Sequence, residues 1–277
     1  MSDASDPKAV LRELEQRARR RFGQHFLHRT DLVERMVRAA GVKPGDRVVE
    51  IGPGLGILTD ALRNAGAQVT AVELDRDLAA HIRTSRPDVV VVERDAVRVN
   101  WDELCPEPDG LVVANLPYNV GTNLVVELIR HPSAFRSVTV MLQAEVVSRM
   151  LAGPGSDAYG SLSVYCAAFS DARFVFGIPP GAFYPPPKVD SAVIRLDPRR
   201  EPAVGAAGPE NFQRVVRASF AQRRKTILNS LGTLYDREQA LAALHTAGIP
   251  PTIRAETLDV AAFRELAAAL HPPSLTS

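Results

Sequence analysis

Hydrophobic positions in the first half of the chain fall into short runs that predict buried strands. The runs cover residues 47–51, 68–73, 88–92, 111–114 and 137–142. Between these runs apolar side chains recur at helical spacing, as Leu58, Leu62 and Ala65 do. Strands that are apolar on both faces and alternate with helices are typical of a parallel sheet covered by helices.

The pattern changes in the second half of the chain. Segments 171–183 and 189–198 predict two further strands, joined as a hairpin-like edge of the sheet by the proline-rich "FYPPPK". Apolar positions after residue 210 follow helical spacing only. The predicted class is therefore α/β, a Rossmann-like sheet with helices on both faces plus a small C-terminal all-helical domain. The predicted parts are a leader (1–29), the α/β domain (30–198), a linker rich in proline, glycine and alanine (199–210) and the helical domain (211–277).

Composition narrows the class of protein without naming a function. The chain has 277 residues, 45% of them hydrophobic and 23% charged, which is ordinary for a globular protein. A net charge of +1 does not exclude nucleic acid, because binding depends on local clusters. The polar first residues and the lack of long apolar runs predict no secretory signal and no membrane span. Cys105 and Cys166 lie far apart and outside any CxxC, so we expect a cytoplasmic protein without disulfide or metal.

A glycine-rich turn follows the first strand, in the stretch "VVEIGPGLGILT". Glycine allows a tight turn and lets a ligand approach the backbone. A dinucleotide site would need glycines in the pattern GxGxxG, but Ile57 takes the last of these positions. With Glu50 before it, the spacing resembles motif I of S-adenosylmethionine-dependent methyltransferases. Gly52 and Gly54 are the predicted contacts, and a turn without a ligand is the alternative.

Carboxylates follow the next two strands. Glu73 ends the second strand, where a carboxylate can accept hydrogen bonds from both hydroxyls of a ribose. Asp95 follows the third strand and suits the exocyclic amine of adenine, although a carboxylate there is more often a helix cap. Asp75 is predicted to be such a cap. Because ligands of open α/β sheets bind at the carboxyl ends of strands, these groups predict one cleft.

The fourth strand ends in Asn115-Leu116-Pro117-Tyr118. The Asn115 side-chain oxygen and the Leu116 carbonyl can accept the hydrogens of an aromatic amine and aim its lone pair at a methyl group. Pro117 fixes the backbone and removes a competing donor. Tyr118 offers a flat face to a base drawn out of its helix. We predict Asn115, Leu116 and Tyr118 as catalytic residues, and a strand-end turn with a buried tyrosine is the alternative.

Seven segments within residues 19–231 together resemble the ribosomal RNA adenine N6-dimethyltransferases, and the resemblance covers about residues 19–270. They are "RRRFGQHFL", "EIGPGLGILT", "VELDRDL", "ANLPYN", "MLQAEVVSRMLAGPGSDAYGSLSV", "FYPPPKVDSAV" and "FAQRRKTILNSL". The last segment and "YGSLSV" point to the small-subunit (16S) branch. The resemblance implies S-adenosyl-L-methionine as cofactor and transfer of methyl groups to N6 of two adjacent adenines in a hairpin loop near the 3′ end of 16S rRNA. The implied partner is the 30S small ribosomal subunit or its precursor during maturation.

The resemblance also implies roles for single residues. The segment "GQHFL" would cover the cofactor, with His25 and Leu27 as contacts, although asparagine is usual at the position of His25. Phe183 would close the base pocket opposite Tyr118, and its alternative is a core phenylalanine at a hairpin end. The other positions that match cofactor contacts are Gly52, Glu73, Asp95 and Asn115.

Two basic clusters are candidates for contact with RNA phosphates. One contains Arg17, Arg19, Arg20 and Arg21, and the other contains Arg223, Arg224 and Lys225. The second cluster is predicted to open a helix, where positive charge opposes the helix dipole. That mismatch favours a role outside helix stability.

Other functions remain as alternatives at this point. One is an assembly factor of the small subunit that acts mainly by binding. Another is a 23S rRNA adenine methyltransferase of the macrolide-resistance type, against which "FAQRRKT" argues. Enzymes with Asn-Pro-Pro-Tyr that methylate DNA adenine or protein glutamine fit less well, because Leu116 replaces the first proline. The chain shows no exposed heptad pattern, so a monomer is expected.

Overall fold

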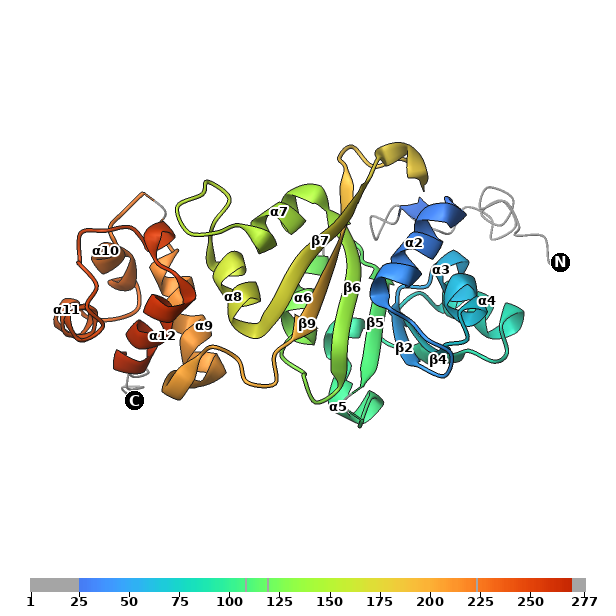
Figure 1. The fold of residues 1–277 in the computed structure, drawn as a ribbon, viewed down its shortest axis with the longest axis horizontal. Helices are drawn as coiled ribbons and strands as arrows, with labels where there is room; N and C mark the ends of the chain where they lie inside the picture. Colours follow the sequence, from blue (N-terminus) through green and yellow to red (C-terminus); the bar gives the residue numbers. More distant parts are fainter. Residues whose placement is uncertain (1–24, 108, 119, 223, 271–277) are drawn as a thin grey trace. The chain divides into compact units, whose positions relative to one another are not determined.

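The computed structural model describes residues 25–270 except 108, 119 and 223 (Figure 1). These residues form two compact units. One comprises residues 25–147 and 172–198, and the other comprises residues 148–171 and 199–270. The division differs from the predicted domains, because residues 148–171 join the helical unit. The reason is local to that unit: α8 (Ser161–Phe169) is almost wholly apolar and packs on α9 (Gly208–Ser219).

A seven-stranded sheet forms the centre of the α/β unit, in the order β4-β3-β2-β5-β6-β9-β7. Strands β2 to β6 run parallel and β9 is antiparallel to β6, which confirms the predicted sheet and its added edge. The strands are β2 (Arg47–Ile51), β3 (Gln68–Glu73), β4 (Val90–Glu93), β5 (Gly110–Asn115), β6 (Phe135–Gln143), β7 (Ser170–Ile178) and β9 (Ser191–Pro198).

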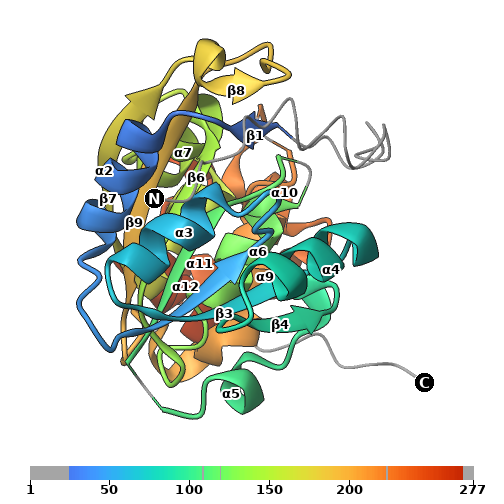
Figure 2. The same ribbon diagram turned by 90° about the vertical axis from the view of Figure 1, so that its right-hand side faces the viewer.

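Helices cover both faces of this sheet, as predicted (Figures 1 and 2). α2 and α3 pack side by side on one face, and α6 lies on the other. α3 buries Leu58 and Leu62, which are one helical turn apart, as the apolar spacing predicted. The helices of the unit are α2 (Thr30–Ala40), α3 (Ile57–Asn64), α4 (Arg76–Ser85), η2 (Ala96–Arg98), α5 (Trp101–Leu104), α6 (Gly121–Leu128), η3 (Pro180–Ala182) and the first half of α7 (Ala144–Leu151).

A second, two-stranded sheet joins segments that lie far apart in the sequence. β1 (Phe26–Leu27) pairs antiparallel with β8 (Phe183–Tyr184), and Leu27 faces Phe183 in the register. Both of these side chains are buried in the same hydrophobic core. The pairing ties the start of the described chain to the loop between β7 and β9.

The helical unit is built around aromatic rings. Phe169 packs edge-on against Phe212, and Phe220 packs against Phe263. All but Phe220 of these rings are almost completely buried. The remaining helices are η4 (Gly205–Ala207), α10 (Ile227–Leu231), α11 (Arg237–Thr246), η5 (Ala255–Thr257) and α12 (Val260–Ala269).

Two details of this unit differ from the prediction. Residues 199–207 are not a bare linker, because the amides of Arg199 and Ala203 donate to Phe169 and Ala168 in the same unit. The prediction that the basic cluster opens a helix is wrong. α10 begins at Ile227 after Thr226, which has extended backbone angles, and Arg224 and Lys225 lie in the preceding turn.

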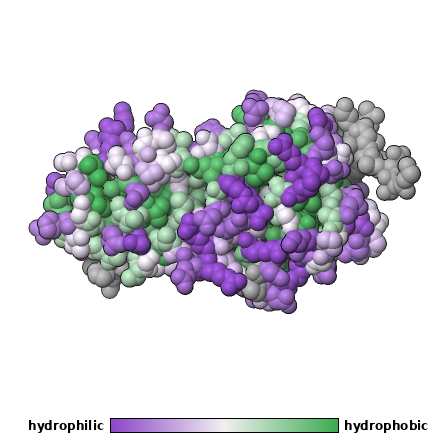
Figure 3. Space-filling view, viewed as in Figure 1, coloured by the Kyte–Doolittle hydropathy of each residue, from purple (hydrophilic) through white to green (hydrophobic). Residues whose placement is uncertain are grey.

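The face of the molecule in Figure 3 carries both hydrophilic and hydrophobic patches. Arg173 of β7 and Arg195 of β9 both bind the Asp197 carboxylate of β9, at 3.1 and 2.8 Å. Within the described ranges, no helix combines the length and the apolar character that crossing a membrane requires.

Candidate active site

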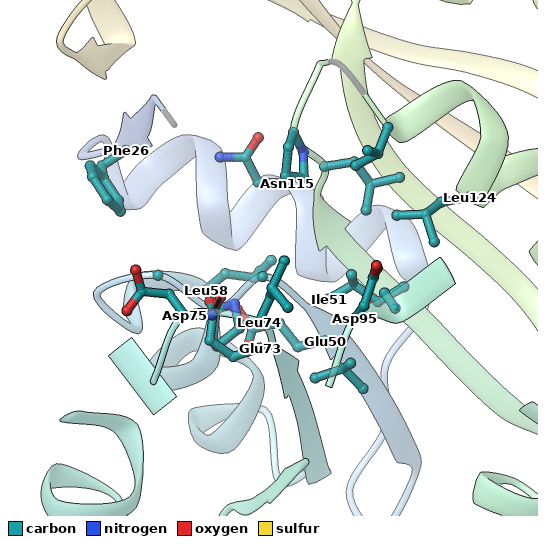
Figure 4. A pocket seen from close by; sticks show the side chains of 18 of the residues that line it. Phe26, Glu50, Ile51, Leu58, Glu73, Leu74, Asp75, Asp95, Asn115 and Leu124 are labelled. Atoms are coloured by element: carbon teal, nitrogen blue, oxygen red, sulfur yellow. Dashed lines mark hydrogen bonds between the residues drawn. The ribbon is translucent and has the colours of Figure 1, made fainter. Parts of the chain in front are cut away.

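A cavity of about 500 Å³ lies at the carboxyl ends of β2, β3 and β5 (Figure 4). Its volume is in the range that holds a cofactor-sized molecule. Asn115 lies on one side of it, and Glu73, Leu74 and Asp95 lie on the other. The predicted site residues that line this cavity are His25, Leu27, Gly52, Gly54, Glu73, Asp95, Asn115, Leu116 and Tyr118. The structure therefore brings together residues that are up to 93 positions apart (25 to 118) in the sequence.

The glycine turn after β2 needs glycine for two reasons. Gly54 and Gly56 have φ angles of +56° and +88°, which side chains disfavour. Neighbours also crowd both positions: a Cβ on Gly54 would lie 3.0 Å from the Phe26 ring, and one on Gly56 would overlap Arg86 at 2.3 Å from its Cζ. A Cβ on Gly52 would meet no atom within 4 Å, so that part of the turn faces open space.

Arg86, which does not line the cavity, supports the turn, and sequence reasoning missed it. Its guanidinium is almost buried, donates to both oxygens of Asp60 at 2.8 and 2.5 Å, and reaches the Leu55 carbonyl at 3.3 Å. A buried arginine normally needs such partners. Nothing in its sequence neighbourhood distinguishes it, because the contact spans 26 positions.

The two oxygens of the Glu73 carboxylate differ in their hydrogen bonding. One oxygen accepts the Asp75 amide at 2.9 Å, whereas Oε2 is buried and has no hydrogen-bond partner in the protein. Burial raises the pKa of Glu73. An unmet buried acceptor is uncommon, and a diol that donates to it would satisfy it. The predicted cap is confirmed as well, because Asp75 accepts the amides of Asp77 and Leu78.

Asp95 is a helix cap, its alternative predicted role, and also lines the cavity. Its Oδ1 accepts the Val97 amide at 3.0 Å and so caps η2, while the carboxylate stands on the cavity wall (Figure 4). Leu74 and Val97 line the same wall and are 51% and 52% exposed. Exposed aliphatic side chains beside carboxylates suit the faces of a purine, and sequence reasoning missed both. The available signal was an apolar residue one or two places after each carboxylate.

Glu50 lies at the floor of the cavity and is 1% exposed. Its Oε2 has no hydrogen-bond partner in the protein. Burial raises the pKa of Glu50 to about 8, so the carboxyl group holds its proton near neutral pH.

Asn115 and Tyr118 form the opposite wall. The Asn115 amide donates from Nδ2 to the His25 carbonyl at 3.3 Å. The Tyr118 hydroxyl shares a 2.6 Å hydrogen bond with Ser191, and burial raises the pKa of the phenol. The rings of His25 and Tyr118 have centroids 5.5 Å apart. The Leu116 side chain is buried, which anchors the backbone between the two.

Some predicted residues lie elsewhere. Phe183 is 3% exposed, packs in the core opposite Leu27 and is absent from the cavity lining, while its neighbour Tyr184 is 40% exposed. This position favours the core alternative, and the base-closing role of Phe183 stays a prediction. Arg224 and Lys225 are exposed in the helical unit. Arg223 and the cluster Arg17, Arg19, Arg20 and Arg21 lie outside the described residues. Among the residues that are described, no cluster of His, Cys, Asp and Glu could hold a metal ion.

Comparisons with known proteins agree on one family. The model of the family described as "Ribosomal RNA adenine dimethylase" matches residues 15–271. The chain is 44% identical over 258 residues to a ribosomal RNA small subunit methyltransferase A of Syntrophotalea carbinolica, which covers 92% of this chain and 98% of that protein. It is 42% identical over 271 residues to the protein of the same name from Pseudomonas syringae pv. tomato, with 96% and 100% covered.

Solved structures are similar to the chain over most of its length. A dimethyladenosine transferase from Plasmodium falciparum has a TM-score of 0.73 at 25% identity, with 87% of this chain and 96% of that chain covered. The 23S rRNA methyltransferase ErmE has a TM-score of 0.63 at 28% identity, with 88% and 99% covered.

Proposed function

The chain belongs to the ribosomal RNA adenine dimethylase family, and we propose that it transfers methyl groups to N6 of two neighbouring adenines near the 3′ end of 16S rRNA. The observation that carries this proposal is the placement of Asn115, Leu116 and Tyr118 at the edge of a cavity whose other wall suits a nucleoside. Identity of 42–44% to small-subunit enzymes, against 28% to a 23S enzyme, supports 16S rRNA as the substrate.

The residues present fit S-adenosylmethionine, the cofactor of this class of enzyme. The unmet oxygen of Glu73 suits the ribose hydroxyls, and Leu74 and Val97 suit the faces of the adenine. Asp95 stands where it can accept from the adenine amine, and Gly52 leaves the backbone open to close approach. When bound, the cofactor supplies a methyl group that its sulfonium activates for transfer.

Asn115 and Leu116 act on the substrate amine in this proposal. The lone pair of an adenine N6 amine is delocalised into the ring, which makes the amine a poor nucleophile. Oδ1 of Asn115 and the carbonyl of Leu116 accept its two hydrogens and favour a tetrahedral nitrogen with a free lone pair. No strong base is required, because the amine proton becomes acidic once the nitrogen has received the methyl group.

Tyr118 holds the base by stacking. Its ring is fixed by the bond from its hydroxyl to Ser191. A stacked base gains about 1–3 kcal/mol on an aromatic side chain in single-stranded recognition. The raised pKa keeps the phenol neutral, so Tyr118 acts as a platform and does not remove a proton.

The helical unit supplies cations for the RNA backbone in this proposal. Arg224 and Lys225 are exposed in a turn before α10. Gln213, Arg214 and Arg217 of α9 line a cavity of about 470 Å³ in the same unit, together with Thr233. Each phosphate contact should steepen the slope of log binding constant against log salt concentration by about one.

The partner we propose is the 30S subunit or its precursor, met by a cytoplasmic monomer. The test is methyl transfer from tritiated S-adenosylmethionine to small subunits that lack the modification, with large subunits as the control. Label in small-subunit RNA alone is the expected result. Label in large-subunit RNA would favour the 23S alternative. Binding to small subunits without label, under conditions in which a known relative is active, would favour the assembly factor.

A further inference from the structure

Residues 25–28, here called the strap, are fastened to the loop between β7 and β9 at both ends. His28 donates its amide to the Ala182 carbonyl, and its Nε2 lies 3.1 Å from the Gly181 carbonyl. At the other end, Nδ1 of His25 lies 2.7 Å from the Pro185 carbonyl. The β1–β8 pairing closes the stretch between them.

The strap also meets both walls of the cavity. The Phe26 ring lies against Gly54 of the glycine turn, 3.0 Å from the place that a Cβ would take. The His25 carbonyl accepts the Asn115 amide, and the His25 ring lies beside the ring of Tyr118. The position of the strap is therefore coupled to the residues that would bind the cofactor and to those that would bind the base.

The bond to Asn115 decides which way the amide faces. A carboxamide can be turned by 180°, which exchanges its donor and its acceptor. A carbonyl accepts hydrogen bonds only, so the His25 carbonyl selects the orientation with Nδ2 toward the strap. In this orientation Oδ1 points away from Phe26 and is left as an acceptor (Figure 4). The opposite orientation would present N–H groups to the hydrogens of a substrate amine.

We propose that His25 is a positioning residue for methyl transfer, whose ring anchors the strap to Pro185 and whose carbonyl keeps Asn115 Oδ1 as the acceptor for the substrate amine. The inference rests on the proposed function, because it assigns a task to Asn115 in that reaction. It adds a residue that acts through Asn115 without accepting a proton itself.

This role predicts a pH profile that differs from that of a base. To bind the Pro185 carbonyl, Nδ1 must carry a hydrogen, which it does both in one neutral tautomer and in the imidazolium. Positioning therefore survives a change in the charge of the ring. If His25 acted as a base, the rate of methyl transfer would fall at low pH. This fall would be absent in variants that lack the imidazole ring.

The test compares His25→Ala and His25→Gln with His28→Ala in the full-length protein. His28→Ala is the matched control, because it removes a ring anchor of the same chemistry from the same strap, but at a residue whose carbonyl does not bind Asn115. Single-turnover transfer to unmodified small subunits should fall about tenfold in His25→Ala, as expected for one lost hydrogen bond. His28→Ala should stay within about twofold, and His25→Gln should recover part of the rate because its amide can donate to Pro185.

A second readout does not depend on activity. In protein labelled with ¹⁵N-asparagine and without cofactor, the side-chain amide signals of Asn115 are identified by their loss in Asn115→Asp. They should shift and exchange faster in His25→Ala but not in His28→Ala. Equal rates and equal spectra in the two alanine variants would overturn the inference, as would a pH profile whose acid limb disappears in His25→Gln. If the wild-type protein transfers no methyl group, the proposed function fails, whereas the spectra still test the contact.

Discussion

The two walls of the cavity are built in different ways. The wall that suits the cofactor consists of consecutive strand ends, and each of its groups follows its own strand directly: Gly52 after β2, Glu73 at the end of β3 and Asp95 after β4. The wall that suits the base is assembled from distant segments. Asn115 bonds a residue 90 positions away and Tyr118 bonds one 73 positions away. The first wall follows from the sheet, whereas the second depends on long-range contacts.

The sharpest way to separate the walls is to remove the acceptor at Asn115. Asn115→Ala should lower the single-turnover rate about 100- to 1000-fold, the range for losing a group that stabilises a reacting centre. Calorimetry should find the cofactor bound within about tenfold of wild type, because the wall formed by Glu73 and Asp95 is intact. If cofactor affinity falls as far as the rate does, the walls are not separable.

The same division explains what the sequence could predict. The parallel sheet, the glycine turn and Glu73 follow from local patterns, because strand periodicity and turn chemistry act over a few residues. Arg86 could not be found this way, because it follows α4 and contacts Asp60 and the glycine turn from a distant part of the sequence. The orientation of the Asn115 amide likewise depends on His25, which no local pattern connects to it.

Boundaries and one aromatic residue were harder to predict. The start of α10 depends on the backbone of Thr226 rather than on the basic residues before it. The assignment of residues 148–171 to the helical unit depends on tertiary packing of α8, which helical periodicity alone cannot reveal. A phenylalanine at this position suits both a pocket and a core, and the burial of Phe183 opposite Leu27 favours the core.

A substitution in the glycine turn should destabilise the wall that suits the cofactor. Gly56→Ala should lower the free energy of unfolding by about 2–4 kcal/mol, because it combines an unfavourable φ angle with overlap on the Arg86 guanidinium. Denaturant unfolding of Gly56→Ala, Arg86→Ala and the double variant forms a double-mutant cycle. The double variant should lose less free energy of unfolding than the two single variants lose together. Strict additivity would mean that Arg86 does not restrict the turn.

The pH dependence of stability should reveal Glu50. Because its pKa is raised to about 8 in the folded protein from an ordinary value of 4.5, the unfolded chain loses the proton first as pH rises. The stabilisation is fully present below pH 4.5 and is lost as pH rises through 8, at up to ~1.4 kcal/mol per unit. Glu50→Gln should therefore lose less stability than wild type between pH 5 and 8. Glu34→Gln, at an exposed position of α2, is the control and should follow wild type.

The smallest effect is expected in the base wall, at the hydroxyl of Tyr118. Tyr118→Phe leaves the buried Ser191 hydroxyl without its partner and should cost about 1–2 kcal/mol of stability, with a rate loss of a few fold. Adding Ser191→Ala should recover part of that stability, since removing both partners costs less than removing one. Tyr118→Ala should lose far more activity, because the stacking face is gone. Equal rates for Tyr118→Phe and Tyr118→Ala would contradict the platform role.

Methyl transfer to adenine N6 of 16S rRNA is tested by identifying the methylated nucleotide and its position. Small subunits without the modification are incubated with the protein and S-adenosylmethionine, and fragments of the 16S rRNA are analysed by mass spectrometry after nuclease digestion. We expect N6,N6-dimethyladenosine at two neighbouring adenines in a hairpin loop near the 3′ end, and none with Asn115→Ala. Methyl groups on another atom, on 23S rRNA or on no nucleotide at all would contradict it.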